Sequence, residues 1–261
     1  MSVLAARIEG IGFWTRGLPS WTAAREHALT GASPAEAATK PSPSLLPANE
    51  RRRAPETVAV ALEVAMAACE AARRDPASLP SVFASTHGEL AITDYMCATL
   101  AQEPRSLSPI RFHNSVHNAA AGYWTIGTGA MQPANAISAH EASFAQGLIE
   151  ALAQLAYGSE AVLLVAYDGQ AVGPLAQVAP SEGLLGGALV LASEGEGISL
   201  RARLVPKDAS GDVRNGPLSQ WAAANAMAPM LPLFDVLARG EGEVRLPAGP
   251  AHDLIVEVTR D

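Results

Sequence analysis

The sequence predicts an α/β protein of three layers, with a mixed sheet between two layers of helices. Segments with strand and helix patterns alternate along most of the chain. Residues 161–168, AVLLVAYD, are an uninterrupted apolar run, which is typical of a strand buried on both faces. Hydrophobic residues make up 49% of the 261 residues and charged residues 17%, so the chain can bury a large core.

The first elements follow from apolar spacing and from helix and strand breakers. A strand at 7–14 ends before Gly17 and Pro19, and a loop rich in Pro, Ser and Ala is expected at 31–48. Pro55 suits the first turn of a long helix. The patterns then predict a strand at 81–86, a helix at 92–102, a loop at 103–109, a helix within 116–129, a strand at 134–140, a helix at 143–158 and the strand at 161–168.

The last part of the chain has a different pattern, with several strands in succession. Strands are predicted at 188–193 and 199–205, and because only a short SEGEG lies between them they are expected to be antiparallel neighbours. GEGEVR at 240–245 lacks the spacing of a phosphate loop and predicts a turn. Helical stretches around 219–228 and 232–240 and a strand at 252–258 complete the chain.

Charge and hydropathy exclude several classes of function. The formal net charge is −8, which argues against nucleic acid as a partner because binding to phosphates needs a basic face. No apolar stretch reaches the roughly 18 residues of a membrane span. The opening MSVLAARIEG runs into acid and glycine rather than a secretory core, so a cytoplasmic location is expected.

Two cysteines are too few for a disulfide framework. Cys69 and Cys97 lie in separate helical patterns without the spacing of metal ligands. They are expected to be ordinary reduced thiols unless one is a nucleophile.

A histidine pair gives the first candidate site. His113 and His117 are four residues apart, and His140 with Glu141 could complete a zinc site. The spacing matches no established zinc signature, and the alternative is that these side chains bond to backbone or to an interface. No cofactor and no metal are therefore expected.

Two further patterns give weaker candidates. Ser115 or Ser143 could act with a histidine as a hydrolase, but the G-x-S-x-G nucleophile motif is absent. The run Arg51, Arg52 and Arg53 could contact an acidic carrier protein, or it could be a solvated cluster ahead of a helix.

Three longer segments, taken together, resemble β-ketoacyl synthases, the condensing enzymes of the thiolase-like superfamily. NERRRAPETVAVALEVAMAACEAA is similar to their first long helix. FHNSVHNAAAGYWTIGTGAMQPANAISAHEASFAQGLIEALAQLAYGSEAVLLVAYD is similar to the stretch with their active-site strand, turn and helix. GGALVLASE resembles the strands that close the first half of the fold. The resemblance implies a thiolase-like half-fold over 1–205, with 206–261 as an extension that caps the sheet, in a single domain of 1–261.

The chain departs from the family at the active-site turn. The resemblance places Glu141 where an active condensing enzyme has its cysteine, at the start of a buried helix. Carboxylates are poor acyl carriers because a mixed anhydride hydrolyses readily. The family's second half supplies catalytic histidines, and His252 does not match their motif. Gln132 also replaces the family's usual glycine before the proline that precedes the active-site strand.

These departures indicate a chain-length-factor-like subunit that is non-catalytic on its own. The resemblance implies a heterodimer with an active β-ketoacyl synthase in type II fatty-acid or polyketide synthesis, such as that of aryl polyenes. An acyl carrier protein would bring the growing chain, and a homodimer is possible when the chain is alone. The residues expected at the interface or tunnel, with ordinary core as the alternative, are Phe112, Asn114, His117, Asn118, Tyr123, Trp124 and Met131.

Two other functions stay open. Glu141, alone or with His140, could act as an acid or base in decarboxylation or hydrolysis of an acyl thioester, if its pocket is sheltered enough to raise its pKa. A metal hydrolase that uses the histidine pair is the remaining alternative.

Overall fold

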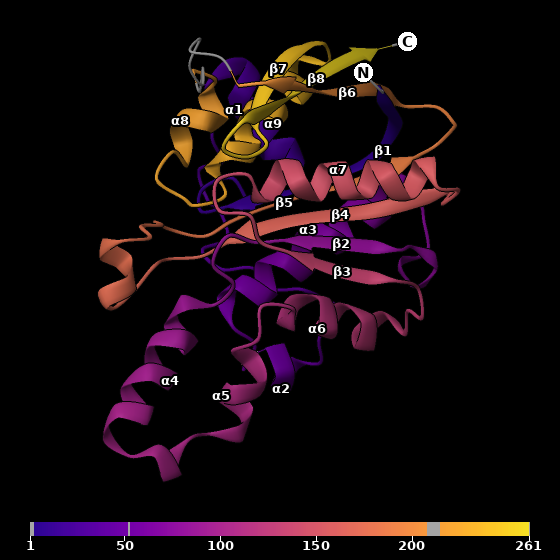
Figure 1. The fold of residues 1–261 in the computed structure, drawn as a ribbon. Coiled ribbons are helices and arrows are strands. Elements are labelled where there is room, and N and C mark those ends of the chain that lie inside the picture. The colour runs from indigo at the N-terminus through magenta and orange to yellow at the C-terminus, as the bar shows by residue number, and fades with distance from the viewer. Residues whose placement is uncertain (1–2, 52, 208–214, 261) are drawn as a thin grey trace.

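The structure is a computed structural model that describes residues 3–51, 53–207 and 215–260. In this part of the chain, eight strands form a mixed sheet (Figure 1). The strands follow the order β3-β2-β4-β5-β1-β6-β8-β7. Their bounds are β1 Leu4–Thr15, β2 Ser81–Ala84, β3 Ala134–Ile137, β4 Ala161–Asp168, β5 Leu185–Ala192, β6 Ile198–Pro206, β7 Gly242–Pro247 and β8 His252–Arg260.

Helices cover both faces of this sheet. Their bounds are α1 Trp21–Thr30, α2 Ala48–Arg51, α3 Glu56–Ala72, α4 Leu90–Gln102, α5 Pro109–Asn114, α6 Ala119–Thr128, α7 Ser143–Ala156, α8 Pro217–Trp221 and α9 Leu231–Arg239. Short 3₁₀ turns are η1 Pro76–Ser78, η2 Pro104–Ser106, η3 Pro174–Gln177 and η4 Ala228–Met230. The predicted three-layer α/β/α architecture with a mixed sheet is confirmed.

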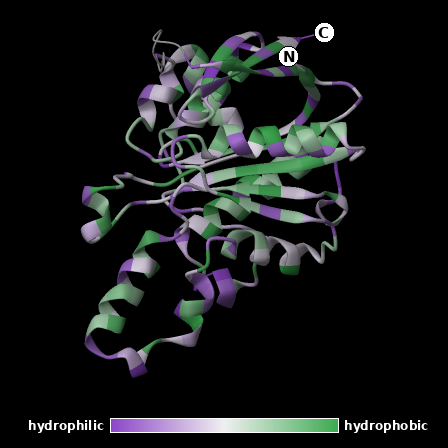
Figure 2. Ribbon diagram, in the orientation of Figure 1, coloured by the Kyte–Doolittle hydropathy of each residue, from purple (hydrophilic) through white to green (hydrophobic). Residues whose placement is uncertain are grey.

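Two apolar clusters lie on opposite faces of the sheet because successive strand residues point to opposite sides. On one face, Val82 and Leu164 pack with α7 and α9. On the other face, Phe83 and Leu163 pack with α3 and α6. Strand β4 is buried along its whole length, as its apolar run predicts, and Figure 2 shows it almost entirely in the hydrophobic colour.

Helix α3 lies unusually close to β1, and two glycines make this possible. A Cβ atom at Gly10 would collide with the backbone oxygen of Ala68, and one at Gly12 with that of Val64. Any larger residue at either position would push the helix off the sheet.

The expected hairpin between the strands at 188–193 and 199–205 is wrong. Strand β1 lies between β5 and β6 and pairs antiparallel with both. The chain crosses β1 at a register shift between Ile8 and Gly10, and Gly197, with a φ of 136°, passes over Ile8. A short loop therefore connects two strands that run in the same direction on either side of β1.

The structure differs from the sequence-based expectations at three other places. The helix expected around 219–228 is only the short α8. Beyond it, the side-chain amide of Asn225 donates to the backbone carbonyls of Asp168 and Glu182, which holds this segment in a non-helical path. GEGEVR continues into the edge strand β7 instead of forming only a turn. The sequence reading also omitted α1, which Ser20 caps at its start and Gly31 at its end.

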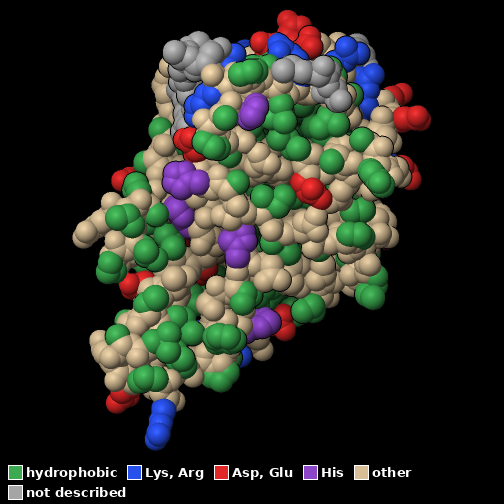
Figure 3. All heavy atoms as spheres, in the orientation of Figure 1, with side chains coloured by type: hydrophobic (Ala, Val, Ile, Leu, Met, Phe, Trp, Pro, Cys, Tyr) green, Lys and Arg blue, Asp and Glu red, His purple; other side chains and the backbone are tan. Residues whose placement is uncertain are grey.

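Helices α4 and α5 project from the body of the molecule (Figure 1). We call residues 90–114, which contain these helices and η2, the arm. Only Met96 of α4 is buried, and Figure 3 shows hydrophobic side chains over the arm. Among the described helices, none has the length and apolar character needed to cross a membrane.

Candidate functional site

The candidate site lies at one edge of the sheet, where three parallel strands end. Strand β2 runs parallel to both β3 and β4, so their carboxyl ends meet. Ligand sites in α/β sheets favour this edge. The segments that follow these strands are residues 85–89, which we call the β2 loop, residues 138–142, which we call the β3 turn, and Asp168 at the end of β4.

The β3 turn has a strained backbone that polar contacts hold in place. His140 has a φ of 55°, in the left-handed region that few residues other than glycine adopt. The Ser143 hydroxyl donates to the carbonyl of His140 at 2.6 Å and accepts from the amide of Ala139 at 2.9 Å. Thr86 of the β2 loop places its hydroxyl 3.1 Å from the same His140 carbonyl.

Glu141 lies in this turn, just before α7, but it is not sheltered. Half of its side chain is exposed, and its Oε1 lies 3.6 Å from Nζ of Lys207. Glu141 therefore does not lie in the sheltered pocket that the acid–base alternative requires. His140 is also exposed, and the structure shows no hydrogen bond between these two described side chains. This arrangement gives little support for acid or base chemistry.

Asp168 is the buried carboxylate of the site. It is fully buried and accepts the hydroxyl of Ser85 at 2.7 Å, the amide of Thr86 at 2.8 Å and the amide of His87 at 3.0 Å. Burial raises the pKa of this carboxyl above its ordinary value, and the three hydrogen bonds oppose that rise. The sequence reading missed Asp168, although a charged residue directly after an apolar strand was a usable signal.

The expected interface residues divide into exposed and buried groups. Phe112 is 60% exposed, Met131 is 95% exposed, and Asn118 is exposed as well. Asn114 is buried and accepts the hydroxyl of Tyr123 at 3.1 Å.

His117 contributes a ring contact to the site, and Trp124 does not reach the surface. Nε2 of His117 lies 2.8 Å from the carbonyl of Ser85. The Trp124 side chain is fully buried against Phe83, with ring centroids 6.3 Å apart. Trp124 thus lies in the core, which is the alternative that the sequence left open for this residue.

Two residues of the arginine run, Arg51 and Arg53, are described by the structure. The Arg51 guanidinium turns inward and donates to the carbonyl of Leu46 and the hydroxyl of Ser42. Arg52 lies outside the described residues. Arg53 is exposed. The contact of this run with a carrier protein stays a prediction.

The metal and serine alternatives also fail on geometry. Within the described residues, no group of three His, Cys, Asp or Glu side chains could hold a metal ion. The ring of His113 lies against Tyr123, at a centroid distance of 6.2 Å. The hydroxyls of Ser115 and Ser143 bond to the backbone carbonyls of Phe112 and His140 rather than to an imidazole.

Neither cysteine lies in the site. Cys69 is buried in α3, and burial raises the pKa of its thiol to about 12. A thiol with so high a pKa is a poor nucleophile at neutral pH. Cys97 is exposed on α4 of the arm.

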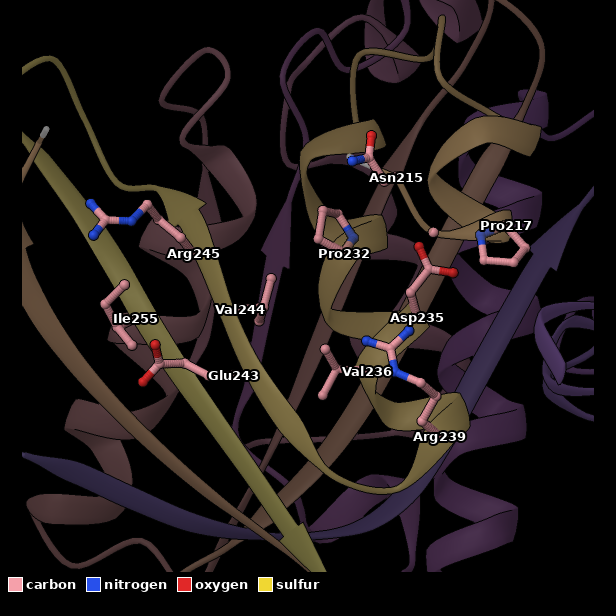
Figure 4. A pocket seen from close by; sticks show the side chains of 11 residues that line it. Asn215, Pro217, Pro232, Asp235, Val236, Arg239, Glu243, Val244, Arg245 and Ile255 are labelled. Atoms are coloured by element: carbon pink, nitrogen blue, oxygen red, sulfur yellow. The ribbon is translucent and has the colours of Figure 1, made fainter. Parts of the chain in front are cut away.

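Three cavities help to place the site. One of about 650 Å³ lies between the start of α3 and the arm, and its lining includes Thr57, Glu89 and Ile110. A neighbouring cavity of about 430 Å³ shares Ile110 and extends along α6. The third, of about 580 Å³, lies between α9 and β7, far from the carboxyl ends of β2 and β4 along the sheet (Figure 4).

Known proteins resemble this chain in sequence pattern and in fold. The family model of the β-ketoacyl synthase N-terminal domain matches residues 21–251. A search of curated protein sequences finds no match.

Solved structures share the fold at low sequence identity. A chain of the ketosynthase ApeO in complex with its chain length factor ApeC, from Xenorhabdus doucetiae, is 24% identical with a TM-score of 0.74, over 97% of this chain and 99% of that chain. A chain of the ishigamide ketosynthase/chain length factor is 12% identical with a TM-score of 0.74, over 98% and 99%.

A third structure contains a carrier protein. A chain of AntDE:AntF, described as a type II polyketide synthase acyl-carrier protein in complex with its ketosynthase, is 12% identical with a TM-score of 0.73, over 100% of both chains. The full-length overlap in all three cases means that the matched chains have about the length of this one. Because the family model covers most of its length, this chain belongs to the β-ketoacyl synthase N-terminal domain family.

Proposed function

We propose that the chain is a chain-length-factor-like subunit, non-catalytic on its own, that pairs with an active β-ketoacyl synthase. The observation that carries the proposal is Glu141 in the turn before α7, where the family resemblance places the nucleophilic cysteine. Its carboxylate is half exposed and pairs with Lys207, an arrangement suited to a structural contact. The named complexes among the similar structures support this choice of partner.

The free edge of β3 supports pairing through this side of the sheet. Its residues are mostly exposed, and no described strand lies beyond it. Exposed apolar side chains surround this edge and the arm, namely Leu100, Ile110, Phe112, Val116, Ile126 and Met131. Exposed apolar groups gathered in this way are typical of an interaction surface.

The cellular role follows from the partner. The pair would extend an acyl chain delivered by an acyl carrier protein in cytoplasmic type II polyketide or fatty-acid synthesis, for example of an aryl polyene. This chain would shape the space that the growing chain occupies and so limit or permit elongation.

Co-expression tests the proposal. This chain and a β-ketoacyl synthase encoded beside it should purify as a stable 1:1 complex, measured by light scattering after size-exclusion chromatography. The synthase should elongate a carrier-bound acyl chain only in the complex, and Glu141→Ala should leave both pairing and elongation unchanged. Normal elongation by the synthase alone would refute the role of this chain in elongation. Loss of product with Glu141→Ala in a complex that still forms would refute the non-catalytic assignment.

We extend the proposal to the domain organisation, with 206–261 as a cap on the half-fold of 1–205. Strand β8 pairs along the whole of β6, and α9 buries Leu233, Phe234 and Leu237 in the apolar cluster that α7 shares. Ending the chain at residue 205 would uncover this cluster, so the shortened chain should be insoluble. A soluble, cooperatively folded product would contradict this division.

A further inference from the structure

A second feature of the site is the way in which Asp168 organises the β2 loop. All three groups that donate to its carboxylate belong to Ser85, Thr86 and His87, which follow one another directly. The Ser85 hydroxyl also accepts from the amide of Gly88 at 2.8 Å. Asp168 makes no ion pair with any described residue, so its carboxylate is committed to this loop.

The β2 loop connects β2 to α4, and we call it the first root of the arm, meaning the segment through which the chain enters it. Its last residue, Glu89, caps α4 by accepting the amide of Ala91 at 3.3 Å. The Glu89 carboxylate also accepts the hydroxyl of Thr57 at 2.7 Å, which ties the loop to the start of α3. The direction in which α4 leaves the body therefore depends on the conformation of this loop.

The second root of the arm contacts the same loop. The chain returns from α5 to α6 through His117, whose Nε2 lies 2.8 Å from the carbonyl of Ser85. The loop also contacts the β3 turn, because the Ser138 hydroxyl donates to the carbonyl of Thr86 at 3.1 Å. One short segment thus joins both roots of the arm to the turn that contains Glu141.

We propose that Asp168 is a positioning residue that sets the orientation of the arm and so prepares it for the partner subunit. The argument about the partner rests on the proposed function. The arm has little support of its own, since only Met96 of α4 and Asn114 of α5 are buried among its residues. A partner that binds an arm already in place has less ordering to overcome, and so binds more tightly.

The chain has a matched control in Asp235 on α9. Its carboxylate is also buried and accepts two backbone amides and one serine hydroxyl, from Leu218 at 2.9 Å and from Ser219 at 3.1 and 2.6 Å. Figure 4 shows Asp235 beside Pro217, next to the start of α8. The two aspartates thus have the same set of donors, but only Asp168 contacts the roots of the arm.

The experiment compares Asp168→Asn with Asp235→Asn in the full chain. Each variant turns one acceptor oxygen into a donor, so both should lower the melting temperature. Asp168→Asn alone should speed amide hydrogen exchange in residues 86–118 and weaken partner binding, each by about tenfold, the value of one hydrogen bond to a charged group. Equal weakening of the partner complex by Asp235→Asn, or wild-type exchange and binding in Asp168→Asn, would overturn the proposal.

A milder pair of variants covers the case in which Asp168→Asn does not fold. Ser85→Ala and Ser219→Ala each remove one hydroxyl donor and keep the carboxylate. Ser85→Ala should speed exchange in 86–118 and Ser219→Ala should not, and equal exchange in that segment would overturn the proposal. Exchange is measured on the isolated chain, so failure of the wild type to bind a synthase would count against the proposed function and not against the role of Asp168.

Discussion

The two edges of the sheet differ in how they treat their unpaired backbone groups. Strand β3 is ANAI, with no charged residue. Strand β7 at the other edge contains Glu243 and Arg245 and ends at Pro247. Charges and proline are the usual means by which proteins protect an edge strand from pairing. Strand β3 therefore lacks the protection that β7 has.

Hydrogen bonding shows which groups face outward at each edge. The amides of Ser81 and Ser85 donate to the carbonyls of Pro133 and Ile137, so the backbone groups of Ala136 face away from β2. At the other edge, the amide of Ala248 donates to the carbonyl of His252. The alternation along an antiparallel pair therefore turns the backbone groups of Glu243, Arg245 and Pro247 away from β8. Proline, which has no amide hydrogen, thus stands at an outward position of the protected edge.

Proline substitution at the two edges should give the largest difference. Ala136→Pro removes an outward amide at β3 without loss of a bond to β2, and should weaken partner binding by about 10- to 100-fold. Glu243→Pro is the matched change at β7 and should leave binding within about twofold. Biolayer interferometry with the immobilised synthase measures both. Equal effects at the two edges would show that β3 is not the pairing edge.

A charge beside the β3 edge should have the next largest effect. Met131→Asp places a carboxylate on a 95% exposed side chain and should weaken partner binding by about tenfold. Leu204→Asp on β6 is the control, because Leu204 is also exposed, at 42%, but lies away from β3. Both variants should unfold within about 0.5 kcal/mol of the wild type. Similar binding losses in both variants would contradict the expected location of the interface.

Removal of protection from β7 should produce a weak gain of association. Glu243→Val takes away a charge of the edge strand, which lies 3.6 Å from Arg203 of β6. We expect concentration-dependent self-association with a dissociation constant on the order of 1 mM. Glu241→Val, just outside the strand, should stay like the wild type. Sedimentation velocity at several concentrations measures this, and a monomeric Glu243→Val would show that its charge is not what protects β7.

The smallest expected effect is a change with pH in the unfolding free energy, caused by Asp168 on the β3 side of the sheet. Burial raises the pKa of Asp168, so the folded chain holds this proton more tightly than the unfolded chain. The stabilisation that protonated Asp168 provides is therefore present at low pH, and it is lost as pH rises from about 4 through the raised pKa. The unfolding free energy of the wild type, relative to Asp168→Asn, should fall over that range in urea titrations.

The ionisable groups around Asp168 affect the design of that titration. His87 favours the carboxylate, while Glu89 and Tyr167 belong to the same charged neighbourhood, and His117 contacts Ser85. His87→Gln should therefore be measured beside the wild type, because it removes the side chain whose electrostatic interaction lowers the pKa of Asp168. A relative stability that rises with pH would contradict the role of burial.

Much of the fold could be predicted from the residues because it depends on local pattern. The apolar run of β4, the face of α7 and the start of α3 at Pro55 all lie where the sequence places them. The crossing of β5 to β6 over β1 could not be predicted, because strand order depends on partners far along the chain. Strand β7 was missed for another reason, because a short edge strand with charges has no strong apolar period.

The candidate site could be predicted in part from the sequence. Glu141 and His117 were identified from spacing and resemblance, and both lie at the carboxyl edge of the sheet. The sequence left core and interface open for Trp124, because an aromatic residue is typical of both, and only the structure shows its ring in the core. The contact of Arg51 with the carbonyl of Leu46 could not be predicted, because this contact has no signature in the sequence.

What the sequence determined by itself is the three-layer class, the order of most elements and a carboxylate before α7, because apolar period and residue identity are local properties. Only the tertiary structure decided how exposed Glu141 is, which edge of the sheet is open and what Asp168 holds. Those properties depend on atoms brought together from distant parts of the chain, as when Asp168 meets Ser85. Burial and hydrogen bonding exist only once the chain has folded.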